Sequence, residues 1–193
     1  MAKKTPDLDR FKPETRLVAA GRGYTEHGFV NPAVYHASTV TFPDTETYYS
    51  RNQEYLYGRR GTPTSRALEE AISIAEGGDF TRLAPSGMAA VSMTLLGFLG
   101  RGDHLLMTDA VYLPTRSLVT GMLARFGVET TFFDPLIGAR IADLVTPRTA
   151  MIYLESPCSR TMEVSDVPAI AAAGHAAGAL VAIDNTWAGA RFF

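Results

Sequence analysis

The sequence predicts an α/β fold in which a mostly parallel sheet carries helices on both faces. Apolar, strand-like runs alternate with helical segments five times between residues 61 and 193, and short links join them. This alternation is typical of parallel sheets whose crossover helices cover both sides. The composition agrees, because 46% hydrophobic and 20% charged residues in a chain of 193 are ordinary for a globular domain with a sizeable core.

The first 60 residues differ from the rest of the chain. They are polar, show little helical periodicity and contain four prolines, Pro6, Pro13, Pro32 and Pro43. This composition favours an extended arm over a packed layer, and the β-forming run at 32–42 could lie along a partner chain. We therefore expect an extended N-terminal arm over residues 1–60, with dimer contacts, and a ligand-binding domain over residues 61–193.

The elements after residue 60 follow from their caps and periodicity. Thr62 and Pro63 are a typical helix start, and Gly77-Gly78 is a typical end. A strand at 80–84 and an apolar helix at 87–99 should follow. Asp166 or Ser165 should cap a later helix that runs to Ala177. The other predicted elements are strands at 104–108, 128–133, 149–155 and 179–184, and helices at 114–126 and 139–145.

Charge, cysteine and histidine content exclude several classes of protein. The net charge of −2 does not favour nucleic acid or an anionic membrane as a partner. The first residues have no apolar signal-peptide region, and no apolar run reaches the roughly 18 residues that span a bilayer. Cys158 is the single cysteine, and the four histidines lack the spacing of metal ligands, so we expect no disulfide, no metal site and a cytoplasmic location.

The stretch APSGMAA, residues 84–90, is a candidate phosphate site. A strand followed by Ser86, Gly87 and Met88 at a helix start would direct free amides and the helix dipole at an anion. An ordinary strand-to-helix turn is the alternative for this segment alone. Neither a GxxxxGK[ST] nor a GxGxxG motif is present, which argues against nucleotides.

Three further sites complete a pattern at the predicted strand ends. Tyr112 could stack on a flat ligand, Tyr57 and Arg59 offer donors matched to phosphate, and Asp184 could pair with a protonated ring nitrogen. Each has an ordinary alternative: an aromatic residue at the core edge, a solvated loop, or an acid that caps a turn. Together with Ser86–Met88 they indicate a flat, phosphorylated pyridine ligand, namely pyridoxal 5′-phosphate.

The chain resembles the Cys/Met-metabolism family of pyridoxal-phosphate enzymes, the trans-sulfuration enzymes, and looks most like their cystathionine β-lyase branch. The matching stretches are VNPAVYHASTVTF, YGRRGTPT, SGMAA, DAVYLPTR, YLESPCSRTMEVSDV and AIDNTWA. Close relatives tend to carry Asn-Pro where Ser159-Arg160 stands here. The resemblance implies the type I fold of aspartate aminotransferase, with residues 61–193 as part of the large cofactor-binding domain and a tetramer built from two dimers.

The resemblance also implies roles for individual residues. Ser86, Gly87 and Met88 would bind the cofactor phosphate within the subunit, and Tyr57 and Arg59 would do so in the neighbouring subunit's site. Tyr112 would stack on the ring and serve in catalysis, Asp184 would bind the ring nitrogen, and Thr186 would lie close to the ring. Cys158, His175 and Trp187 are expected to be an inert thiol, a packing or surface residue, and a packing residue of its loop.

The implied reaction is the α,β-elimination of cystathionine to homocysteine, pyruvate and ammonia, a step of methionine biosynthesis. The family needs a lysine that holds the cofactor as a Schiff base, whereas the lysines here are Lys3, Lys4 and Lys12, all in the arm. The family motif with that lysine belongs shortly after Asp184, past the last residue given. We therefore expect the chain to resemble the N-terminal half of the enzyme, with a truncated sheet, and to be inactive alone.

Other functions stay open at this point. Within the family, the chain could belong to a cystathionine γ-synthase, a cystathionine or methionine γ-lyase, or a sulfhydrylase, which share the cofactor site and differ in substrate contacts. It could instead be a non-catalytic fragment that joins intact subunits through its arm. A generic nucleotide-binding α/β domain is the least favoured, because no phosphate-loop signature is present.

Overall fold

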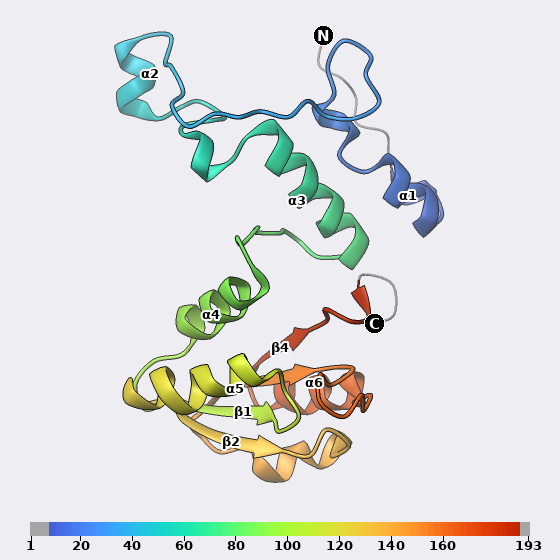
Figure 1. Ribbon diagram of the computed structural model, residues 1–193, viewed down its shortest axis with the longest axis vertical. Helices are drawn as coiled ribbons and strands as arrows, with labels where there is room; N and C mark the ends of the chain where they lie inside the picture. The colour runs from blue at the N-terminus through green and yellow to red at the C-terminus, as the bar shows by residue number, and fades with distance from the viewer. Residues whose placement is uncertain (1–7, 190–193) are drawn as a thin grey trace. The chain divides into compact units, whose positions relative to one another are not determined.

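The computed structural model describes residues 8–189 and divides the chain into two compact units, with the boundary between Leu83 and Ala84 (Figure 1). The first unit contains short helical elements and the second contains the sheet. The predicted boundary at residue 60 differs from this division because the helix that begins at Pro63 packs within the first unit. The role of residues 1–60 in dimer contacts stays a prediction.

The first unit contains three α-helices and three 3₁₀ turns among its described residues. These elements are η1 (Leu8–Arg10), α1 (Pro13–Ala19), η2 (Arg22–Tyr24), α2 (Thr45–Ser50), η3 (Gly58–Arg60) and α3 (Pro63–Glu76). The expectation of a uniformly extended arm is therefore wrong for α1 and α2, whose six or seven residues are too few to show helical periodicity. Residues 25–44 lack helix and strand, as expected for an arm.

Helix α3 begins and ends as its sequence predicts. Thr62 accepts a hydrogen bond from the Ser65 amide (3.3 Å), and the Ser65 hydroxyl oxygen accepts one from the Thr62 amide (2.9 Å). This capping box satisfies two amides that the helix cannot pair internally. Gly77 ends the helix with a φ of +66°, a conformation that side-chain-bearing residues rarely adopt. Helix α3 packs on α1 and η2.

A four-stranded parallel sheet forms the centre of the second unit, which confirms the predicted fold class. Its strands are β1 (His104–Thr108), β2 (Glu129–Phe133), β3 (Thr149–Glu155) and β4 (Leu180–Asp184), in the order β2-β1-β3-β4. All neighbouring strands run in the same direction, so their carboxyl ends share one edge. Ligands of open α/β sheets bind at that edge.

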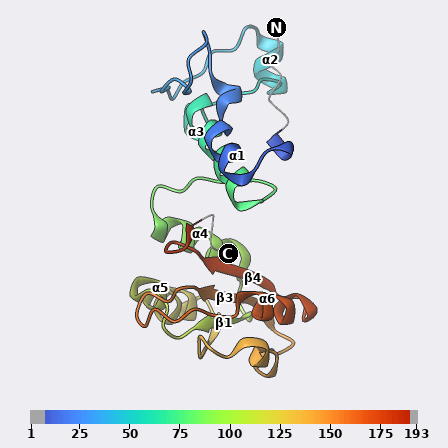
Figure 2. The same ribbon diagram turned by 90° about the vertical axis from the view of Figure 1, so that its right-hand side faces the viewer.

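Helices cover both faces of the sheet, as Figure 2 shows. One face packs on α4 (Gly87–Phe98) and α5 (Leu113–Leu118), which continues as the π-helical turn η4 (Val119–Leu123). The other packs on η5 (Gly138–Leu144) and α6 (Val167–Ala176), which Asp166 caps. Successive residues alternate between the two cores, with Met151 in the first and Ile152 in the second.

The strand predicted at 80–84 is absent. These residues have no helix or strand assignment, and the Phe80 side chain is exposed. A strand forms only where a neighbour pairs its backbone groups, and the described sheet pairs only β1, β2, β3 and β4. Residues 80–84 therefore lack the pairing partner that the strand prediction assumed.

Within residues 8–189, none of the helices combines the length and the apolar character needed to cross a bilayer.

Candidate functional site

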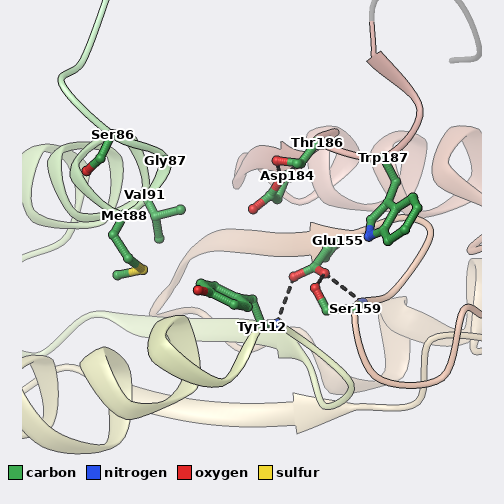
Figure 3. A pocket seen from close by; sticks show the side chains of 10 residues that line it. All are labelled: Ser86, Gly87, Met88, Val91, Tyr112, Glu155, Ser159, Asp184, Thr186 and Trp187. Carbon is green, nitrogen blue, oxygen red and sulfur yellow. Dashed lines mark hydrogen bonds between the residues drawn. The ribbon is translucent and has the colours of Figure 1, made fainter.

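A cavity of about 500 Å³ opens at the carboxyl edge of the sheet in the second unit (Figure 3). The side chains that line it come from the start of α4, the loop after β1, the end of β3 with its following loop, and the end of β4 with its following turn. They are Ser86, Gly87, Met88, Val91, Tyr112, Glu155, Ser159, Asp184, Thr186 and Trp187. The structure thus brings together six residues that the sequence singled out as cofactor contacts: Ser86, Gly87, Met88, Tyr112, Asp184 and Thr186.

The start of α4 presents backbone donors to the cavity. Ser86 caps the helix by accepting a hydrogen bond from the Ala89 amide (3.1 Å). The amides of Gly87 and Met88 have no acceptor within the helix, because the first turn of an α-helix leaves its amides unpaired. A Cβ placed on Gly87 would meet no other atom within 4 Å, so the main chain here is open to a ligand.

Asp184 is the last residue of β4, and its carboxylate points into the cavity (Figure 3). One oxygen, Oδ1, accepts hydrogen bonds from the Thr186 amide (3.1 Å) and hydroxyl (2.5 Å). This contact orients the carboxylate and leaves Oδ2 for a ligand. None of the ion pairs among residues 8–189 involves Asp184, so a cationic group in the cavity would be its first charged partner.

Tyr112 lies at the end of the loop after β1, and its ring lies on the side of the cavity opposite Asp184 (Figure 3). The side chain is 46% exposed, which leaves a ring face available for stacking. Its backbone amide donates a hydrogen bond of 2.8 Å to Oε2 of Glu155. The position of the ring is therefore coupled to a residue on another strand.

Glu155 is a site residue that the sequence reasoning missed. It is the last residue of β3 and only 3% exposed, and its Oε1 accepts hydrogen bonds from the amide (2.7 Å) and the hydroxyl of Ser159. The available signal was the one used for Asp184, an acid that ends an apolar strand. Burial raises the pKa of Tyr153 above its usual range, and the carboxylates of Asp184 and Glu155 act in the same direction.

The structure contradicts the expectation for Trp187 and agrees with the expectation for Cys158. Trp187 is 63% exposed and lines the cavity, so its expected role as a packing residue is wrong. Cys158 is fully buried and donates a hydrogen bond to the Glu155 carbonyl (3.1 Å). Burial, aided by nearby carboxylates, raises the pKa of its thiol to about 11, which agrees with an inert cysteine. His175 is exposed on α6.

Tyr57 and Arg59 belong to the first unit, and neither is among the residues that line this cavity. Tyr57 precedes η3 and is 41% exposed. Gly58 between them is held tightly: its amide donates to the Ser38 carbonyl (2.6 Å), and a Cβ would collide with the carbonyl of Ala37. The turn that carries the two side chains is thus tethered through its backbone, and their role in a neighbouring subunit's site stays a prediction.

The donor set suits a flat, phosphorylated, cationic ring. Unpaired amides at the start of a 12-residue helix match a phosphate, an accessible aromatic face matches a ring, and a carboxylate without a charged partner matches a ring N–H. The cavity volume lies within the range of about 300–1,000 Å³ that is usual for small-molecule sites. Among the described residues no group of His, Cys, Asp and Glu is arranged to hold a metal ion.

Fold and site together define the chain as part of a type I pyridoxal-phosphate fold. The model of the Cys/Met metabolism PLP-dependent enzyme family matches residues 14–193. The chain belongs to this family.

Individual relatives agree. Cystathionine beta-lyase MetC of Escherichia coli is 44% identical over 191 residues, which cover 94% of this chain and 48% of that protein. Cystathionine beta-lyase of Salmonella typhimurium is 44% identical over 189 residues, with 93% and 48% covered. The crystal structure of metB from Corynebacterium glutamicum matches with a TM-score of 0.86 at 26% identity, covering 95% of this chain and 47% of that one. The chain therefore spans about half the length of the relatives it matches.

Proposed function

We propose that this chain forms the cofactor-binding half of a pyridoxal-phosphate-dependent carbon–sulfur lyase of the cystathionine β-lyase type. The observation that supports this most is the convergence of the α4 amides, Tyr112 and Asp184 on one cavity. These groups belong to three separate segments of the chain, and each matches a different part of the same cofactor. The substrate would be a sulfur amino acid, cystathionine, which the enzyme would cleave to homocysteine, pyruvate and ammonia.

Each residue has a defined task in this proposal. The amides of Gly87 and Met88 and the hydroxyl of Ser86 bind the phosphate, and Tyr112 covers one face of the ring. Asp184 holds a proton on the ring nitrogen, and Thr186 fixes the Asp184 carboxylate. The bound cofactor supplies an electron sink for the pair of electrons that remains when the α-proton leaves, and the charged ring nitrogen strengthens that sink.

Two parts of the proposal concern other chains or other segments. Tyr57 and Arg59 would contact the phosphate in a partner subunit, within a homo-oligomer built through residues 1–60. The lysines of this sequence are Lys3, Lys4 and Lys12, all in the arm, and the lysine that binds the cofactor covalently would be a different one. We infer that the 193 residues bind the cofactor without turning over substrate.

The β-lyase type is favoured over the γ-synthase, γ-lyases and sulfhydrylases. Relatives named cystathionine beta-lyase are 44% identical to this chain over the aligned residues, whereas the matched structures of metB, a cystathionine gamma-lyase and a methionine gamma lyase are 26%, 31% and 32% identical. Ser159 supports the same choice, because it lines the cavity where close relatives tend to carry Asn. The test is the product formed from cystathionine by a protein that joins residues 1–193 to the second half of a relative. Pyruvate supports the β-lyase, and 2-oxobutyrate contradicts it.

Cofactor binding is tested on the chain itself through its fluorescence. Trp187 is the single tryptophan and lines the cavity, so the tryptophan emission reports on this site alone. The probe is pyridoxine 5′-phosphate, which lacks the aldehyde and cannot react with the lysines of the arm. We expect a saturable change in Trp187 fluorescence with pyridoxine 5′-phosphate and a much weaker response to pyridoxine. Equal responses to both ligands, or no saturation, would contradict the phosphate site.

A further inference from the structure

We propose that Glu155 is a positioning residue that fixes Tyr112 and Ser159 around the cavity through hydrogen bonds from one buried carboxylate. That Tyr112 and Ser159 are positioned to contact a bound cofactor rests on the proposed function. The hydrogen-bonding arrangement itself does not depend on it, and the two can therefore be tested separately.

The Glu155 carboxylate joins two loops that are distant in the sequence. Its Oε2 accepts a hydrogen bond from the Tyr112 amide (2.8 Å) in the loop after β1, and its Oε1 accepts one from the Ser159 amide (2.7 Å) in the loop after β3. Both loops end at the cavity, where Tyr112 and Ser159 contribute to the lining (Figure 3). A single side chain thus sets the distance between two parts of the wall.

Local helix geometry does not already provide this support. Tyr112 occupies the N-cap position of α5, and its side chain makes no capping hydrogen bond there. In a capping box the side chain at the third helical position would hold the N-cap amide, but here the Thr115 hydroxyl contacts the Met88 sulfur (3.9 Å), and the Tyr112 amide donates to Glu155 instead. Because hydrogen bonds to an ionised acceptor are stronger than neutral ones, this contact restrains the backbone that carries the Tyr112 ring.

Burial makes the carboxylate depend on these donors. Glu155 is only 3% exposed, and none of the ion pairs within residues 8–189 includes it. A buried carboxylate without a cation is costly unless hydrogen bonds satisfy it, and two amides with one hydroxyl do so here. The arrangement holds in both directions: the donors stabilise the charge, and the charge orders the two loops.

The same contact determines what Ser159 presents to a ligand. A carboxylate can only accept, so the Ser159 hydroxyl donates its proton to Glu155 and keeps its lone pairs. Toward the cavity Ser159 is then a hydrogen-bond acceptor, which selects a donor on the bound molecule. Glu155 therefore acts on the cavity through the backbone of Tyr112 and through the polarity of Ser159.

The test replaces Glu155 by Gln, which keeps the size and removes one acceptor. In either orientation the Gln amide group turns its own N–H donors toward the amide of Tyr112 or of Ser159, and two donors cannot pair. We expect hydrogen exchange of at least one of these two amides, measured by NMR on the full chain, to accelerate about tenfold or more, while core amides such as those of Leu106 and Ile152 keep their rates. Unchanged exchange at both amides would overturn the proposal.

Glu163→Gln is the matched control, because Glu163 is an acid of the same loop whose carboxylate, within residues 8–189, accepts a hydrogen bond only from the nearby Thr161 hydroxyl (2.5 Å), and it does not line the cavity. It should leave the hydrogen-exchange rates of the Tyr112 and Ser159 amides unchanged. Equal acceleration of exchange by both variants would show a general effect on the loop and overturn the proposal.

If Glu155→Gln does not fold, hydrogen exchange in the unmodified chain still tests the proposal, because the proposal requires that its Tyr112 amide be protected from exchange. Free exchange there would contradict the structure on which the proposal rests.

Ligand binding distinguishes a positioning role of Glu155 from a role in the stability of the fold alone. Glu155→Gln should weaken pyridoxine 5′-phosphate binding severalfold by Trp187 fluorescence, and Glu163→Gln should not. Unchanged affinity together with loosened amides would overturn the positioning role. If the unmodified chain binds no ligand, the proposed function fails, whereas the exchange result still decides whether Glu155 orders the two loops.

Discussion

Glu155 and Asp184 are direct register partners at the carboxyl ends of the adjacent parallel strands β3 and β4. Their surroundings differ. Both oxygens of Glu155 accept hydrogen bonds from the protein in a buried position, whereas Asp184 is partly exposed and uses one oxygen for Thr186. Of these two adjacent acids, Glu155 therefore uses both oxygens for hydrogen bonds to the loops, and Asp184 keeps one oxygen available to a ligand. This division of roles motivates separate tests of the two residues.

Asp184→Asn should weaken binding of pyridoxine 5′-phosphate about tenfold or more, because an amide cannot stabilise a proton on the ring nitrogen as a carboxylate does. The measurement is a Trp187 fluorescence titration at neutral pH. An analogue with carbon in place of the ring nitrogen provides the control, since it has no N–H to lose. The variant and the unmodified chain should bind the analogue equally, and an equal loss for both ligands would contradict pairing at the nitrogen.

Gly87→Ala should reduce phosphate affinity without destabilising the fold. A methyl group at this position meets no protein atom within 4 Å, and alanine favours a helix over glycine by up to about 1 kcal/mol. The same methyl would stand where the phosphate approaches the α4 amides. We expect an unchanged or higher thermal midpoint and weaker binding of pyridoxine 5′-phosphate.

Gly97→Ala is the control for that variant. Gly97 also lies in α4 with open space around its Cα, but it does not line the cavity. It should likewise give an unchanged or higher thermal midpoint and leave the affinity unchanged. A loss of affinity in Gly97→Ala, or none in Gly87→Ala, would argue against the amides of the α4 start as the phosphate site.

Much of the sheet and cavity could be predicted from local sequence. Parallel strands bring their carboxyl ends to one edge, so Tyr112 after β1 and Asp184 at the end of β4 could be assigned to the same region without coordinates. Residues 80–84 could not be assigned in this way, because a strand depends on a partner that lies elsewhere in the chain. The unit boundary after Leu83 likewise follows from the packing of α3, which periodicity does not reveal.

The sequence did not reveal the roles of Glu155 and Trp187 for a different reason. Glu155 follows a strand as Asp184 does, but its importance lies in which amides it reaches, and Tyr112 is 43 residues away in the sequence. Trp187 follows β4 in a turn, and the direction of a side chain in a turn is set by backbone angles that residue type does not specify. Tertiary hydrogen bonds and turn geometry are therefore the parts that sequence patterns left undetermined.

Cys158 should resist thiol reagents in the folded chain. Its side chain is fully buried, and burial together with neighbouring carboxylates raises the thiol pKa from 9.0 to about 11. Because the thiolate is the reactive form, and this shift lowers the thiolate fraction near neutral pH about 100-fold, the reaction should be slowed even where a reagent can reach the sulfur. Reaction with a chromogenic disulfide should be slow in buffer and fast in urea, and the single cysteine makes the signal unambiguous. Equal rates in both solvents would contradict the buried position.

His104 connects the stability of the sheet to pH. It is 3% exposed at the start of β1, at the sheet edge opposite the cavity. Its Nδ1 contacts the Thr149 hydroxyl (2.8 Å) and its Nε2 the Thr131 hydroxyl (2.9 Å). Burial lowers the pKa of His104 below its ordinary 6.5, with Arg148 acting in the same direction and Glu129 against it. The folded chain therefore takes up this proton at a lower pH than the unfolded chain.

The free energy of unfolding should consequently decrease as the pH falls through about 6.5, because the unfolded state then binds more protons, and the decrease should level off below the folded pKa. Urea unfolding followed by circular dichroism between pH 7.5 and pH 5.5 measures this slope. His104→Gln, which cannot be protonated, should flatten the slope in that window, whereas His175→Gln, at an exposed position on α6, should keep it. An identical slope in His104→Gln and the unmodified chain would assign the pH dependence to other groups.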